Sequence, residues 1–198
     1  MSQSASDLVG LKARINTRLK LVLTVERDDG HTVYVHAEAI SREIFDAHFM
    51  AIARTYTQIQ AGLGAISGMR VAWRLLQRAA NEYADKETAE QQNGALLAEI
   101  IRLANVLAPD GEGGWRVFPL DDALRKSYFN EDDRDEVLNA LAFFTVCSVM
   151  LRRKVLPIYM AGAAVVWGAQ TSSLNCTEYA AFLTKSIAEG STGAKAMG

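Results

Sequence analysis

The chain has 198 residues, a net charge of −2 and 49% hydrophobic residues, which suits a single domain with its own core. A near-neutral charge excludes a global electrostatic attraction to nucleic acid or to an anionic membrane. The two cysteines, Cys147 and Cys176, form no CxxC pair, so we expect a reducing, cytosolic setting. The N-terminus lacks the charged and apolar regions of a secretory signal.

The first predicted element is a β-hairpin, with strands near 19–27 and 31–37. β-Branched and aromatic residues flank Asp29-Gly30, a pair typical of tight turns because such turns need positive φ. No other convincing strand follows. A lone hairpin has to pack on helices or pair with another chain through its edges. The candidate residues for this self-association are Leu21, Leu23, Val25, Val33 and Val35.

Three amphipathic helices are predicted after the hairpin, because apolar residues recur at helical spacing behind residues that favour helix N-termini. The expected caps are Ser41, Ser67 and Thr88, the last forming a capping box with Gln91, and the last apolar residues are Ile59, Tyr83 and Leu107. Glycines at 62, 64 and 68 separate the first two helices. The segment 109–114, PDGEGG, ends the third helix in a loop and is the best internal boundary of the domain.

Residues 115–118, WRVF, are predicted to be extended because they precede a proline. Asp121 or Asp122 then caps a short helix over 123–129. A longer helix is predicted over 131–153, because it begins with acidic residues and ends with Arg152, Arg153 and Lys154, as the helix dipole favours.

Pro157 restarts the chain, and 158–169 form either a second apolar helix or a buried extended segment. A last helix is expected over 175–188, capped by Asn175 or Thr177, before a disordered tail over 190–198. The predicted fold is therefore mainly α: one domain over 1–189, with about six helices and one N-terminal hairpin.

The most apolar stretch, residues 141–169, has three possible interpretations. Membrane spanning is disfavoured because a spanning helix needs about 20 apolar residues without charges, and three cations interrupt this stretch. A helix that is hydrophobic on all sides is buried in its own core or against a partner. Under the partner interpretation, the binding residues are Phe143, Phe144, Met150, Leu151, Ile158, Tyr159, Met160 and Trp167.

No catalytic, cofactor-binding or metal-binding residues are predicted. His31, His36 and His48 have no metal-ligand partners at suitable spacing. Gly62-x-Gly64 follows a predicted helix rather than a strand, so it does not match a phosphate-binding loop. We expect the protein not to be an enzyme, although a site assembled from distant residues remains an alternative.

Three stretches, VLTVERDDGHTVYVHAEAISREIFDAHFMAIARTY, GMRVAWRLLQRAA and TSSLNCTEYAAFLTKS, together resemble the tail assembly chaperones of long-tailed, siphovirus-type bacteriophages. The resemblance covers about two thirds of the chain and rests on patterns of residue type. It implies a largely helical, oligomeric protein that acts in the host cytoplasm during virion morphogenesis. It also implies two partners, the tape measure protein, held as an apolar helical client, and the tail tube protein. A longer form made by ribosomal frameshifting is common in that family. The alternative function is a structural tail or connector protein of the virion.

Overall fold

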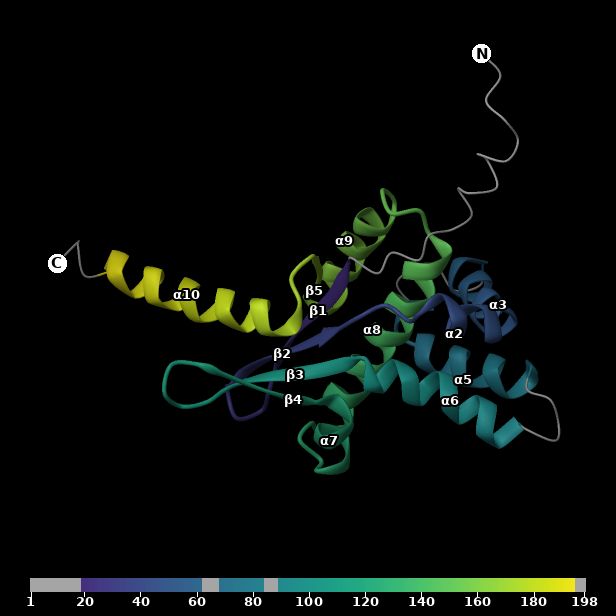
Figure 1. Cartoon of the computed structure of the whole chain (residues 1–198), viewed down its shortest axis with the longest axis horizontal. Helices are drawn as coiled ribbons and strands as arrows, with labels where there is room; N and C mark the ends of the chain where they lie inside the picture. The colour runs from purple at the N-terminus through teal and green to yellow at the C-terminus, as the bar shows by residue number, and fades with distance from the viewer. Residues whose placement is uncertain (1–18, 62–67, 84–88, 195–198) are drawn as a thin grey trace, which may run out of the picture.

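A five-stranded antiparallel sheet lies at the centre of the protein, in the order β4-β3-β2-β1-β5 (Figure 1). The structure is a computed structural model that describes residues 19–61, 68–83 and 89–194. The strands are β1 (Lys20–Glu26), β2 (Thr32–Ala37), β3 (Ala104–Pro109), β4 (Trp115–Pro119) and β5 (Ala169–Ser172). The predicted hairpin is therefore only the middle of a larger sheet.

The expectation of a mainly α fold with one hairpin is wrong. The described residues form eight helices together with the five strands, so the fold is mixed α/β. The helices are α2 (Arg42–Ala47), α3 (Phe49–Ala61), α5 (Ala72–Tyr83), α6 (Ala89–Arg102), α7 (Leu120–Arg125), α8 (Glu131–Met150), α9 (Leu156–Trp167) and α10 (Cys176–Ala194). Three short strands, β3, β4 and β5, account for the error, and only β4 had been expected to be extended.

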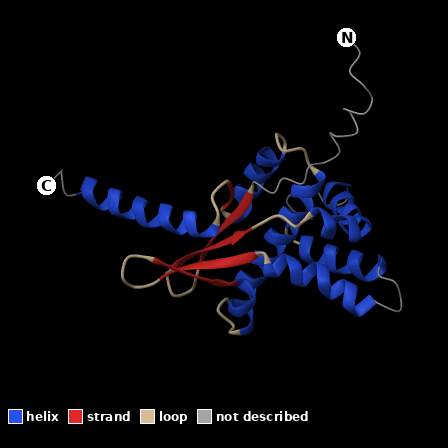
Figure 2. Cartoon of the chain, viewed as in Figure 1, coloured by secondary structure: helices blue, strands red, loops and turns tan. Residues whose placement is uncertain are grey.

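The two faces of the sheet are covered differently. On one face, inward-pointing residues of the strands, such as Leu23, Val35 and Val106, join a large core with helices α3, α5, α8 and α9. On the other face, α10 is the one described helix that packs against the strands (Figure 2). Its residues Tyr179 and Leu183 form a smaller apolar cluster with Val22 of β1 and Leu107 of β3. Because residues alternate between the faces of a strand, each central strand contributes to both clusters.

Helix α8 begins as the sequence predicts, and from Val137 to Val149 every residue except Asn139 is buried. The side chain of Asn130 accepts a hydrogen bond from the backbone N–H of Asp133 at 2.7 Å, which caps the first turn. The helix ends at Met150, three residues before the predicted end. The three cations at 152–154 therefore lie in the loop after α8 rather than in its last turn.

Two side chains connect α8 to neighbouring helices. The amide oxygen of Asn139 accepts a hydrogen bond at 3.0 Å from the backbone N–H of Trp73, in the first turn of α5. This bond satisfies a helix amide that would otherwise lack a partner. Phe143 contacts the ring of Trp167 of α9 edge-on, with centroids 6.0 Å apart. The apolar stretch 141–169 thus contains most of the core helix α8, packed against a second helix, α9.

The predicted loop at 109–114 is the turn between β3 and β4. The carboxylate of Asp110 accepts hydrogen bonds from the backbone N–H groups of Glu112 and Gly114, both at 2.8 Å. These bonds lower the pKa of Asp110 because they stabilise its charged form. Gly111 and Gly113 supply the positive φ angles of the turn.

Two of the expected helix caps are present. Ser41 caps α2, and Asn175 caps α10 in a reciprocal pair with Glu178. Helix α10 continues to Ala194, into the segment predicted to be disordered. The remaining predicted features Gly62, Gly64, Ser67, Thr88 and residues 195–198 lie outside the described residues.

Truncating the core of α8 should be costly. Phe144 is fully buried, so we expect Phe144→Ala to lower the free energy of unfolding by about 3–5 kcal/mol through lost burial and an unfilled cavity. Urea denaturation monitored by circular dichroism measures this. Ile158→Ala is the control, because Ile158 is 71% exposed and its truncation should change stability by about 0.5 kcal/mol or less. Equal losses in both variants would contradict this placement of α8.

Candidate functional site

The predicted partner-binding residues divide into three groups by exposure. Phe143, Phe144, Met160 and Trp167 are buried in the main core and present no side chain to a partner in this structure. Met150, Leu151 and Tyr159 are half-buried and pack against that core. Ile158 alone among the eight is exposed. The predicted partner-binding residues are therefore largely residues that hold α8 and α9 in the main core.

The predicted self-association residues of the hairpin lie in the middle of the sheet. Strand β1 pairs with both β2 and β5, and β2 pairs with both β1 and β3, so neither hairpin strand has a free edge. The side chains of Leu21, Leu23, Val25, Val33 and Val35 are all buried. The expectation that the hairpin offers an edge for self-association is corrected by these pairings. An edge of the sheet is instead formed by β5.

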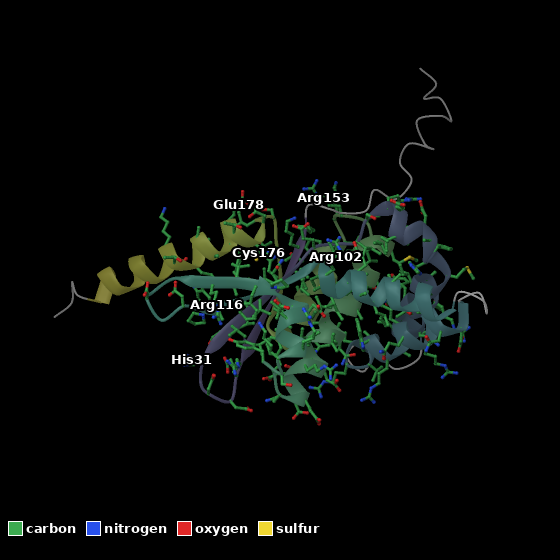
Figure 3. All side chains as sticks on the ribbon, turned by 60° about the horizontal axis from the view of Figure 1, so that its bottom comes forward. His31, Arg102, Arg116, Arg153, Cys176 and Glu178 are labelled. Carbon is green, nitrogen blue, oxygen red and sulfur yellow. The ribbon has the colours of Figure 1, made fainter. Side chains whose placement is uncertain are left out.

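The histidines occupy separate places. His31 lies in the β1–β2 turn (Figure 3), and His48 follows the end of α2. The ring of His36 is fully buried under α10, where Nε2 lies 3.0 Å from the carbonyl oxygen of Leu174 and Nδ1 has no partner. Since a carbonyl accepts, Nε2 carries the proton and donates it. Desolvation lowers the pKa of His36, so the neutral ring is favoured.

The described residues contain no group of three or more His, Cys, Asp or Glu side chains placed to hold a metal ion. Burial raises the pKa of the Cys147 thiol to about 12 and that of Cys176 to about 11. Neither thiol is activated as a nucleophile at neutral pH, because the thiolate is the reactive form.

The outer face of α9 is exposed and carries no charge. It consists of Pro157, Ile158, Ala161, Gly162, Ala164 and Val165. Ile158 is 71% exposed and Val165 is 88% exposed. Polar residues normally cover the solvent side of a surface helix, but none occurs anywhere on α9 except the half-buried Tyr159, whose hydroxyl contacts Gln60 of α3 at 3.2 Å. We call these six residues the α9 outer face.

A groove of about 290 Å³ lies between α9 and the edge strand β5. Its walls are Pro157, Met160, Ala161 and Ala164 on the helix, and Ala169, Gln170 and Thr171 on the strand. Gly168 adopts the left-handed conformation, with φ of 63°, and turns the chain directly from α9 into β5. The helix and the strand therefore run in opposite directions on either side of the groove.

Three cations, Arg152, Arg153 and Lys154, lie just before the N-terminus of α9. All three are exposed, and none forms an ion pair with another described side chain. Figure 3 shows Arg153 at the periphery of the molecule. We call residues 152–154 the basic loop. The basic loop thus places positive charge beside the uncharged α9 outer face.

Sequence reasoning found Ile158 but missed the small residues of the α9 outer face and the whole of the groove. The signal was present, since no charged residue occurs between Lys154 and Glu178, a longer run than a single core helix requires. Beyond this run, no feature of the sequence identified β5 as an edge strand.

Comparison with known proteins identified no relative. No protein-family model, curated protein or solved structure matches the chain. None of the described helices is both long and apolar enough to span a lipid bilayer. The candidate site therefore rests on its geometry alone.

The buried His36 should make the fold sensitive to acid. Its pKa in the folded state is lowered from 6.5, so the unfolded chain binds the proton first as the pH falls. Stability is then fully present above 6.5 and is lost as the pH drops through 6.5 toward the folded-state value. His36→Gln keeps a donor for Leu174 but does not titrate. We expect a smaller loss of stability between about pH 7.5 and about pH 5.5 in this variant than in the wild type.

Urea midpoints at the two pH values measure this difference. The pKa of His48 is lowered as well, but its contribution is common to both proteins and cancels in the comparison. Identical pH dependences for the wild type and His36→Gln would show that the buried ring is not the titrating group.

Proposed function

We propose that this protein is a tail assembly chaperone of a long-tailed bacteriophage, which acts in the host cytoplasm by binding an apolar segment of the tape measure protein. The observation that carries the proposal is the charge-free α9 outer face, with Ile158 and Val165 exposed. An uncharged apolar helix face of this kind is typical of a surface that meets another protein. The resemblance in three stretches of sequence supplies the identity of the client.

The fold supports only part of what the resemblance implies. The resemblance implies a largely helical protein, and the central five-stranded sheet differs from that. A holding function does not depend on helix content, however. It needs an apolar surface, and charges nearby that keep the free protein in solution. The α9 outer face and the basic loop meet these two needs, and binding rather than catalysis is the activity we propose.

Introducing charge on the α9 outer face should abolish holding without unfolding the protein. We expect the double variant Ile158→Asp, Val165→Asp to retain wild-type circular dichroism and thermal stability, because both side chains are exposed. Co-expression with the tape measure protein, followed by separation of soluble and pelleted client, measures holding. The wild type should raise the soluble fraction, and the double variant should not.

Met50→Asp is the matched control. Met50 is 54% exposed on α3, away from α9 in the sequence, so this variant should hold the client as well as the wild type. Client precipitation that is unchanged by the wild type at every ratio would overturn the proposal. Mass spectrometry of purified particles separates the alternative, since abundant, stoichiometric peptides of this chain would identify a structural virion protein.

A further inference from the structure

We infer that the groove between α9 and β5 binds its partner as an extended apolar segment that pairs with the free edge of β5, with an acidic flank against the basic loop. This inference rests on the proposed function, because it names the chemistry and conformation of the client segment. It departs from the expectation of a helical client. Three features of the groove lead to it: the strand edge, the uncharged lining and the positive charge at one end.

The groove follows the outer edge of β5. Ala169, Gln170 and Thr171 are consecutive, and successive side chains of a strand point to opposite faces of the sheet. All three line the groove, so the groove must run beside the backbone of the strand rather than over one face. On its other side β5 pairs with β1, and no described strand pairs with the groove side. Backbone N–H and C=O groups of an edge strand are a template for a further strand.

The edge of β5 favours a strand over a helix. An α-helix is about 10 Å wide with its side chains and uses its backbone hydrogen bonds internally, so it cannot extend the ladder of an edge strand. An added strand lies only about 4.8 Å from its neighbour. The four residues of β5 would pair with a segment of about four residues, roughly 13 Å long.

The groove selects apolar side chains. Every second residue of a paired strand would point toward the helix wall, where Met160, Ala161 and Ala164 offer only apolar contacts. No charged residue lines the groove, so a charged side chain entering it would lose hydration without gaining a partner. Strand addition combines backbone hydrogen bonds with such alternating pockets, and that combination gives both affinity and specificity.

Charge fixes the direction of the partner. Because α9 and β5 are joined only by Gly168, Ala164 lies near Ala169 at one end of the groove, and Pro157 lies toward Ser172 at the other. The basic loop ends just before Pro157, at the Ser172 end. All strand pairings in the described sheet are antiparallel. An antiparallel partner runs from the Ser172 end toward Ala169, so its acidic residues must precede its apolar residues.

Two fluorescein-labelled peptides test the inference on the full chain. One has two glutamates followed by alternating valine and alanine, and the other has the same residues with the glutamates last. We expect the first to bind about tenfold more tightly by fluorescence anisotropy. The triple variant Arg152→Glu, Arg153→Glu, Lys154→Glu should abolish the preference. Cross-strand nuclear Overhauser effects between the peptide and β5 should identify the extended conformation.

Filling the groove gives the matched pair of variants. Ala164→Phe places a ring between α9 and β5 and should weaken binding of the first peptide about tenfold or more. Met50→Phe adds a ring at an exposed position of α3 that does not line the groove, and should leave the binding unchanged. Ala164 is exposed, and circular dichroism checks the fold of both. Ala161→Met, also within the groove, is the second filling variant should Ala164→Phe fail to fold.

The results separate this inference from the proposed function. Equal binding of both peptides, a helical bound peptide, or full binding by the filled variants would overturn the inference. So would a dimer that Ala164→Phe dissociates, because the groove would then belong to a second copy. If Ala164→Phe still keeps the tape measure protein soluble, the client segment is not in the groove, and the proposed function stands without it. If the wild type binds the peptide but never changes client precipitation, the proposed function fails and the groove remains a peptide site.

Discussion

The burial of α8 is the constraint on which the rest of the structure depends. A helix of 20 residues is about 30 Å long. In α8, every residue from Val137 to Val149 except Asn139 is buried. Such a helix has no side that can face water, so it has to be covered all round. The sheet covers it through β1, and helices α3, α5, α6 and α9 cover the remaining sides. Strand β1 and these four helices thus share one hydrophobic core with α8.

The elements that sequence reasoning predicted correctly are those with local signals. Asp29-Gly30 marks the first turn, Asn130 marks the start of α8, and Asn175 marks the start of α10. Strand β3 has no such signal: Val106 faces the main core while Leu107 faces α10, so both faces are apolar and the alternation is lost. Its residues fit a helix equally well. Strand β5 has only four residues, too few for any periodicity, and its pairing with β1 joins residues about 150 positions apart.

The candidate site was harder to predict than the fold for a related reason. Residues 140–150 of α8 and the whole of α9 are apolar on every side, so composition alone assigns both to a core or both to an interface. The structure separates them by what surrounds each one. Phe143 and Phe144 of α8 are buried, whereas Ile158 and Val165 of α9 are exposed. Whether a side chain is exposed depends on which elements, distant in sequence, pack beside its helix. The residue types of the helix itself do not determine this.

The position of α9 at the border of the sheet follows from Gly168. Its left-handed conformation ends the helix and sends the chain straight back as β5, which closes the pairing with β1 and leaves the opposite side of β5 open. A side chain at this position would be strained by the positive φ and would approach Thr24 of β1 at 3.5 Å. The same turn therefore creates the strand edge, the facing helix wall and the groove between them. The groove therefore follows from how the sheet ends at β5. The basic loop gives the groove one charged end and one neutral end. This difference between the ends allows the groove to distinguish the two directions in which a peptide could bind.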